Sequence, residues 1–128
     1  MKGYLLDTNA LIGVLFSPDL LSETAKEIVL ESEDLGVSIA ALWEIGIKQS
    51  IGKIDIESSA EEIEAACIKL GICVYPLKAS YIDAMRKLPQ IHKDPFDRIM
   101  IAQAMEEDLS LSTRDSIIPQ YPHVSVMW

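Results

Sequence analysis

Cysteine and histidine are scarce in this 128-residue sequence, which has two residues of each. Cys67 and Cys73 do not form a CxxC pair, so we expect free, buried thiols rather than a disulfide framework. His92 and His123 have no second ligand at the spacing of a metal motif, and we interpret each as a loop or surface residue. The sequence therefore argues against the zinc sites that cysteine and histidine commonly build.

Long hydrophobic runs are also missing, because none approaches the roughly 20 residues that a membrane helix needs. The N-terminal residues reach Asp7 too early for the hydrophobic region of a secretory signal. We therefore expect a cytoplasmic protein with no membrane segment. The length fits one domain with one hydrophobic core, over residues 1–128.

Positive charge is in short supply, since 11 lysines and arginines oppose 20 acids and leave a formal net charge of -9. Proteins that bind nucleic acid passively usually carry a basic surface, so this balance argues against that class. A nuclease that works through bound metal is not excluded, because divalent cations held by carboxylates reverse the local charge. Its substrate contacts would still need local basic residues, or a partner that supplies them.

Apolar runs with strand character alternate with helical patterns along the whole chain, and this alternation predicts an α/β sheet with helices on both faces. We expect strands over residues 3–6, 35–39, 72–75, 109–112 and 124–127. We expect helices over 8–16, 19–33, 40–51, from Ser58 or Ser59 to Gly71, 79–88 and 94–107. Asp94 and Pro95 are the residue types that favour the cap and the first turn of the last of these helices.

Four acids stand where a parallel sheet would bring distant segments together. Asp7 directly follows the first expected strand and Asp115 lies just past the fourth, and ligands bind at the carboxyl ends of parallel strands. Glu44 and Asp97 lie in the first turns of two helices, which can face the same crevice. Converging carboxylates repel one another unless a cation joins them, and hard divalent cations prefer oxygen ligands.

Each acid also has a purely structural interpretation. Asp7 could cap the helix that begins at Thr8, and Asp97 could complement a helix dipole. Asp115 could be a turn residue. Glu44 lies in an otherwise apolar helix, where a lone carboxylate needs a partner. Taken one at a time, the acids therefore do not establish a shared site.

Four segments, considered together, resemble the PIN-domain family, and most closely the VapC-type toxins of bacterial and archaeal toxin–antitoxin pairs. They are residues 5–12, 38–45, 92–104 and 111–115, and the third is the most specific. The resemblance covers almost the whole chain in order and spacing. It implies a three-layer α/β/α fold around a central, mainly parallel sheet of four to five strands.

The resemblance also implies a catalytic site with one or two Mg²⁺ or Mn²⁺ ions. It maps the family's catalytic and metal-binding acids onto Asp7, Glu44, Asp97 and Asp115. Asp94 matches a position that is often acidic in this branch, although helix capping explains it equally well. Asn9 and Thr113 resemble residues that orient ligands, with capping as the alternative. Arg98 and Arg114 are candidate substrate contacts, with a surface charge or ion pair as the alternative.

The activity that the resemblance implies is a metal-dependent endoribonuclease that hydrolyses RNA phosphodiester bonds by in-line attack. It also implies a cognate antitoxin protein, whose C-terminal segment covers a groove, and a homodimer or a toxin–antitoxin hetero-oligomer. The early helices could supply that groove, although such residues are mostly core. The groove candidates are Leu11, Ile12, Leu15, Phe16, Leu20 and Leu21.

Two other functions fit parts of the sequence. A non-catalytic PIN scaffold that binds RNA or protein would share the fold, since a shared fold does not guarantee activity. A phosphoacceptor signalling domain would share the α/β alternation, but it needs neighbouring acids after the first strand and a late lysine. Here Asp7 is followed by Thr8 and Asn9, and no lysine follows Lys93.

Overall fold

Five short strands form one sheet in the computed structural model, which describes residues 3–128. The strand order is β3-β2-β1-β4-β5, and each neighbouring pair is parallel. The strands are β1 (Gly3–Leu6), β2 (Leu35–Ser38), β3 (Cys73–Tyr75), β4 (Leu109–Ser112) and β5 (Val126–Met127). The prediction of a mainly parallel sheet of four to five strands is confirmed.

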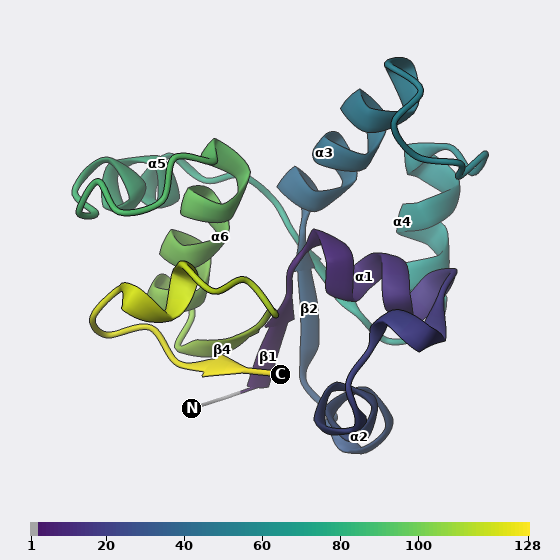
Figure 1. The fold of residues 1–128 in the computed structure, drawn as a ribbon, viewed down its shortest axis with the longest axis horizontal. Coiled ribbons are helices and arrows are strands. Elements are labelled where there is room, and N and C mark those ends of the chain that lie inside the picture. The colour runs from purple at the N-terminus through teal and green to yellow at the C-terminus, as the bar shows by residue number, and fades with distance from the viewer. Residues whose placement is uncertain (1–2) are drawn as a thin grey trace.

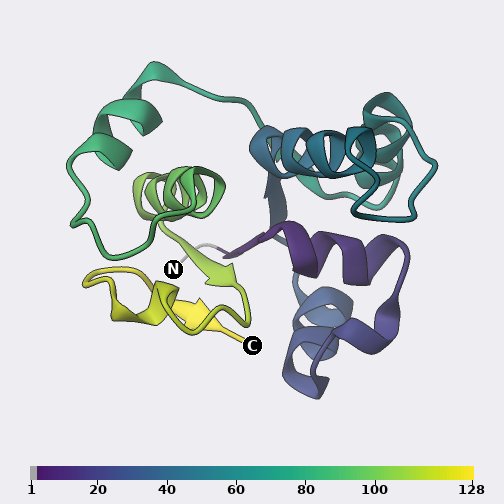
Figure 2. The same ribbon diagram turned by 45° about the horizontal axis from the view of Figure 1, so that its top comes forward.

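Helices enclose this sheet on both sides, as in a three-layer α/β/α fold. In Figures 1 and 2, α1 to α4 lie on one side of β1 and β2, and α5 and α6 lie on the other. The α-helices are α1 (Thr8–Leu15), α2 (Glu23–Glu31), α3 (Ile39–Ser50), α4 (Ala60–Lys69), α5 (Ala79–Arg86) and α6 (Pro95–Glu106). Two 3₁₀ helices are η1 (Pro18–Leu20) and η2 (Ile118–Gln120). No helix among residues 3–128 is long and apolar enough to cross a membrane.

Strand β1 lies at the point where the chain changes direction across the sheet. From β1 the chain moves outward through β2 to β3, and then returns to add β4 and β5 on the other side of β1. In open parallel sheets, a crevice forms beyond the carboxyl ends of the strands at such a reversal. The ends of β1 and β4, which pair from Gly3 and Leu109 to Leu6 and Ser112, therefore define the expected position of a ligand site.

Most element boundaries agree with the sequence prediction to within a few residues, but two elements differ. The helix expected over 19–33 is instead η1 followed by α2, because Leu21 has an extended backbone and Ser22 accepts a hydrogen bond from the Ala25 N–H at 3.0 Å to cap a new helix. The last strand is only Val126–Met127. Both cysteines are free, as expected, but Cys73 is exposed rather than buried.

Arg98 fixes the loop that joins α5 to α6. Its guanidinium is buried and donates from Nη1 to the Pro89 carbonyl at 2.9 Å and to the Tyr121 hydroxyl at 3.1 Å. Nη2 donates to the carbonyls of Met85 at 2.9 Å and Leu88 at 3.4 Å. These contacts give Arg98 a structural role in place of the predicted contact with phosphate.

We expect Arg98→Met to destabilise the protein strongly. Leaving buried acceptors unsatisfied costs about 1–3 kcal/mol, and several carbonyls share this one donor group. The free energy of unfolding, measured by urea titration, should fall by at least that amount. Arg86→Met is the matched control, since Arg86 is exposed and its loss should change stability by less than about 0.5 kcal/mol. Equal effects of the two substitutions would contradict this role for Arg98.

Candidate active site

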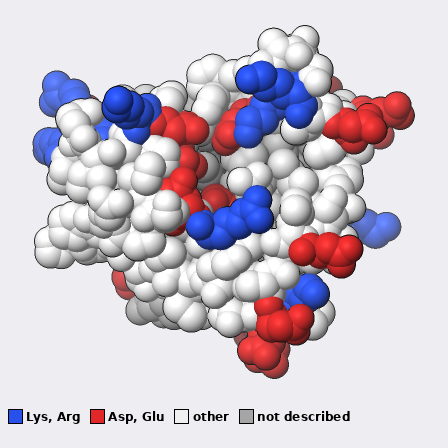
Figure 3. All heavy atoms as spheres, in the orientation of Figure 1, with Lys and Arg blue, Asp and Glu red and all other residues white. Residues whose placement is uncertain are grey.

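A cleft of about 440 Å³ opens at the carboxyl ends of β1 and β4. In Figure 3, acidic atoms gather in a hollow near the middle of the face shown, and basic atoms lie on its rim. The lining residues are Asp7, Thr8, Asn9, Glu44, Lys48, His92, Asp94, Asp97, Arg114, Asp115 and Ser116. All four acids predicted to share a site therefore line one cavity, although they come from four distant segments of the chain.

Asp7 is both a helix cap and a residue of the cleft. Its Oδ1 accepts a hydrogen bond from the Ala10 N–H at 2.8 Å, which caps α1. Burial raises the pKa of Asp7, and the carboxylates of Glu44 and Asp115 add to the rise. Hydrogen bonds from the Thr113 hydroxyl and the Ala10 N–H oppose it. The capping interpretation is thus correct, and it leaves the carboxylate at the cavity wall.

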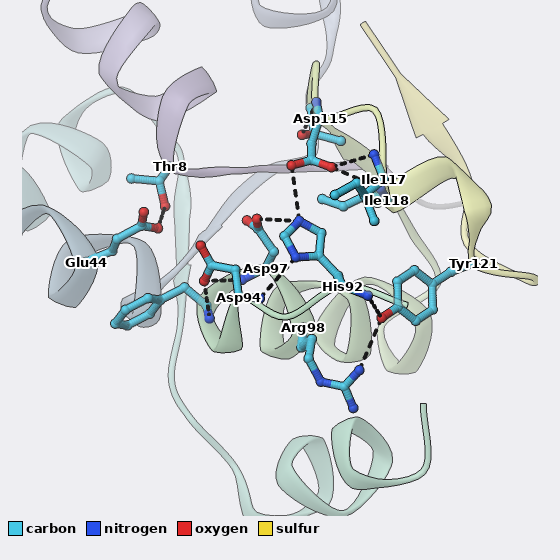
Figure 4. Close-up of polar contacts among 12 residues, drawn as sticks. Thr8, Glu44, His92, Asp94, Asp97, Arg98, Asp115, Ile117, Ile118 and Tyr121 are labelled. Atoms are coloured by element: carbon cyan, nitrogen blue, oxygen red, sulfur yellow. Dashed lines mark hydrogen bonds and ion pairs between the residues drawn. The ribbon is translucent and has the colours of Figure 1, made fainter. Parts of the chain in front are cut away.

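Glu44 finds the partners that its apolar helix required. The Thr8 hydroxyl donates to Oε1 at 2.6 Å (Figure 4), and Lys48 Nζ lies 2.9 Å from Oε2. Lys48 is one helical turn further along α3, at a spacing that favours such an ion pair. Because the Glu44 side chain is only 11% exposed, these two contacts hold a nearly buried carboxylate at the edge of the cleft. The sequence analysis singled out neither Thr8 nor Lys48.

Asp94 and Asp97 come from the start of α6. Asp94 caps this helix, since its Oδ1 accepts from the N–H groups of Phe96 at 2.8 Å and Asp97 at 3.4 Å. Asp94 also lines the cleft. Burial raises the pKa of Asp97 to about 7, and the Asp94 carboxylate contributes to this rise. The neighbouring His92 opposes the rise in part, whereas Asp115 and Asp7 increase it.

Asp115 lies in the turn that follows β4. Partial burial tends to raise its pKa, but hydrogen bonds from His92 and from the N–H groups of Ile118 and Ile117 outweigh this and lower the pKa. Its Oδ1 accepts from Ile117 at 2.7 Å and from Ile118 at 3.0 Å (Figure 4). The turn interpretation is therefore correct, and the turn fixes the carboxylate beside the cleft.

His92 is the main residue that the sequence analysis missed. It does belong to a loop, but its side chain is buried rather than on the surface. Its Nε2 lies 3.0 Å from Asp97 Oδ2 and 3.1 Å from Asp115 Oδ2 (Figure 4). The signal that could have found it is its place two residues before the capping Asp94, in the segment that carries the most specific resemblance.

The remaining predicted residues, Asn9, Arg114 and Thr113, occupy different positions around the cleft. Asn9 is exposed and lines the cleft, and so does Arg114. Thr113 is buried behind the cleft wall, where its hydroxyl is bonded to Asp7 and accepts from the Asp115 N–H at 3.1 Å. Thr113 thus joins the acid that follows β1 to the acid that follows β4.

The donor set of this cleft fits a hard divalent cation. Carboxylate oxygens predominate, as in Mg²⁺ and Mn²⁺ sites, and several of them are desolvated and close to one another. One ligand atom each of His92, Asp97 and Asp115 lies within 4.8 Å of the other two. The residues that could hold such an ion are Asp7, Glu44, Asp97 and Asp115, with Asp94 beside them.

Comparison with solved structures supports the same fold. The chain is similar to a chain of VapBC2 from Rickettsia felis bound to a promoter DNA fragment, at 14% identity and a TM-score of 0.68, over 97% of this chain and 96% of the other. It is similar to a chain of DNA-bound VapBC from Salmonella typhimurium, at 16% identity and a TM-score of 0.66, over 99% and 98%. FitAcB from Neisseria gonorrhoeae matches at 17% identity and a TM-score of 0.66, over 98% and 96%.

Sequence comparison supplies the family. No curated protein matches the chain closely enough to count as a relative. The family model for the PIN domain, however, matches residues 4–124, which include the carboxyl ends of β1 and β4 and every acid of the cleft. This match covers far more than half of the sequence, and it agrees with the earlier resemblance. The chain belongs to the PIN-domain family.

Proposed function

We propose that this protein is a metal-dependent endoribonuclease and the toxin of a toxin–antitoxin pair. The observation that carries the proposal is the convergence of Asp7, Glu44, Asp97 and Asp115 on one cleft. A structural role alone does not explain this convergence, because burying like charges together is unfavourable. Family membership supports a nuclease, and the similarity to VapBC chains supports the toxin assignment.

Some side chains of the cleft would bind the cation, and others orient those ligands. Asp7, Asp97 and Asp115 would hold the cation, with Glu44 completing the acidic wall. A bound divalent cation would stabilise charge on the scissile phosphate and favour attack by water. Thr8 and Thr113 keep Glu44 and Asp7 oriented through their hydroxyl groups. Arg114 is exposed at the cleft, where it can contact an RNA phosphate.

The toxin assignment also implies a protein partner. Ile12 of α1 and Phe16, which directly follows α1, line a second groove of about 580 Å³, together with Ile54 and Ile56. An antitoxin segment with an apolar face fits such a groove. Of the residues first considered for this role, Leu11 and Leu21 are core, whereas Phe16 and Leu20 are exposed. We also infer a homodimer or a toxin–antitoxin hetero-oligomer.

The purified protein, free of antitoxin, should cleave RNA when Mg²⁺ or Mn²⁺ is added and should be inactive with a chelator. Asp7→Asn and Asp97→Asn should each reduce the cleavage rate by at least about 100-fold, since each removes a charge from the metal site. The measurement is gel analysis of labelled RNA and of total cellular RNA after brief induction. DNA of the same sequence should be tested beside it.

Asp19→Asn is the matched control, because Asp19 is exposed on η1 and outside the cleft. It should cleave RNA at the rate of the unchanged protein. If wild-type protein binds RNA but does not cleave it, whichever divalent metal is added, the enzyme proposal is contradicted and the non-catalytic scaffold is supported. Cleavage of DNA alone would contradict the RNA substrate.

Without metal, Asp97 should make stability depend on pH. Its pKa is raised from 3.8 to about 7, so the folded protein binds a proton here that the unfolded chain has lost. Asp97 therefore favours the unfolded state increasingly as the pH rises from about 4 to about 7. In chelator, the melting temperature of Asp97→Asn relative to wild type should rise by a few degrees between pH 5 and pH 8.

Adding Mg²⁺ at pH 8 should raise the melting temperature of wild type above that of Asp97→Asn. A ligand that binds the folded state stabilises it by about 2.7 kcal/mol at 100 times its dissociation constant. Wild type should gain this stability and Asp97→Asn should gain less. Asp19→Asn, which leaves the cleft unchanged, should gain as much stability from Mg²⁺ as wild type. A flat difference between Asp97→Asn and wild type from pH 5 to pH 8 would refute the account.

A small gene upstream of the gene for this chain should encode a DNA-binding antitoxin. Co-expression of its product should yield a complex that purifies together and cleaves RNA much more slowly than the chain alone. Cleavage assays before and after denaturing separation of the two proteins measure this. Unchanged cleavage in a stable complex would argue against the toxin–antitoxin assignment while leaving the nuclease intact.

A further inference from the structure

His92 occupies a position between two of the acids that the proposed metal site requires. Its side chain is 9% exposed, and its Nε2 faces Oδ2 of both Asp97 and Asp115, at 3.0 and 3.1 Å. Figure 4 shows the two carboxylates converging on this one nitrogen. The geometry alone allows two roles, since the nitrogen could bind a cation directly or donate a hydrogen bond to the carboxylates.

The other ring nitrogen distinguishes these roles. Nδ1 accepts a hydrogen bond from the Asp94 backbone N–H at 3.1 Å, so it carries a lone pair and no proton. A neutral imidazole has one N–H, and the bond made by one nitrogen fixes the state of the other. The ring proton is therefore on Nε2, which faces the carboxylates as a donor and has no lone pair for a metal.

The surroundings hold the ring in this orientation. The backbone N–H of His92 donates to the Tyr121 hydroxyl at 2.7 Å, and the same hydroxyl accepts from Arg98. Asp94, which orients Nδ1, is itself held as the cap of α6. The backbone N–H and Nδ1 of His92 are thus both held, and a flip of the ring would put Cδ2 in place of Nδ1, where it cannot accept from the Asp94 N–H.

We propose that His92 is a positioning residue whose Nε2–H holds Oδ2 of Asp97 and Asp115 together, and that it is not itself a ligand. A carboxylate oxygen that accepts one hydrogen bond keeps a second lone pair, which stays available to a shared cation. In metal-free protein the same N–H bridges two groups that would otherwise repel each other. The positioning of metal ligands by His92 rests on the proposed function. The hydrogen bonds of His92 can be tested whether or not the protein is active.

Nitrogen NMR of the imidazole rings tests the tautomer directly in the intact protein. We expect His92 to be protonated at Nε2 and unprotonated at Nδ1, both in chelator and with saturating Mg²⁺. Because the chain has two histidines, His123→Asn assigns the signals; Asn suits the positive φ of 68° at this exposed site. A proton on Nδ1, or loss of the Nε2 proton when Mg²⁺ binds, would overturn the proposal.

Calorimetric titration with Mg²⁺ tests the effect on the site. His92→Ala should bind about 10–100-fold more weakly, the usual loss when a group that orients a ligand is removed. His92→Gln, which can place an amide N–H near Nε2, should recover most of this affinity, and His123→Asn should bind like wild type. Wild-type affinity in His92→Ala, or equal losses in the Ala and Gln variants, would overturn the positioning role.

Circular dichroism establishes that each variant is folded before it is titrated. If His92→Ala does not fold, the tautomer measurement and the Gln variant still decide the question. Failure of wild type to bind Mg²⁺ or Mn²⁺ and to cut RNA would instead refute the proposed function. In that case the tautomer of His92 would still show whether it bridges the two carboxylates.

Discussion

The repulsion among buried carboxylates is the constraint on which the rest of this site depends. The parallel sheet brings Asp7 and Asp115 to adjacent strand ends, and the start of α6 adds Asp94 and Asp97 to the same cleft. Backbone N–H groups at α1, α6 and the turn after β4 each offset part of the cost. They do not remove it, since burial still raises the pKa of Asp97 to about 7. The cleft is therefore built to accept positive charge.

Sequence reasoning located the four acids because their positions follow from topology. A residue that directly follows a buried strand must lie at one edge of the sheet, and this places Asp7 without any knowledge of its contacts. The cap and first turn of a helix are equally local, so Asp94 and Asp97 could be placed from Asp94-Pro95 and the following apolar pattern. The side chains that fit these local positions in the fold are therefore the same ones that line the cleft.

His92 and Arg98 could not be placed in this way, because their roles depend on contacts between distant segments. His92 meets Asp115, which is 23 positions away, and Arg98 reaches a tyrosine hydroxyl that is also 23 positions away. Nothing in the local pattern separates a buried arginine that binds carbonyl groups from one that binds phosphate. The split of the helix expected over 19–33 has a similar cause, since helical periodicity continues across Ser22 although the backbone at Leu21 is extended.

The charge balance of the cleft links substrate binding to the cation. Five aspartates and glutamates line it, and the lysines and arginines among its described lining residues are Lys48 and Arg114. Lys48 is already paired with Glu44, so it contributes little net attraction for a phosphate. A polyanionic substrate would therefore meet net negative potential in a cleft without metal. On the proposed function, a divalent cation held by these carboxylates would supply the positive charge that the cleft lacks, so metal affinity and RNA affinity should be coupled.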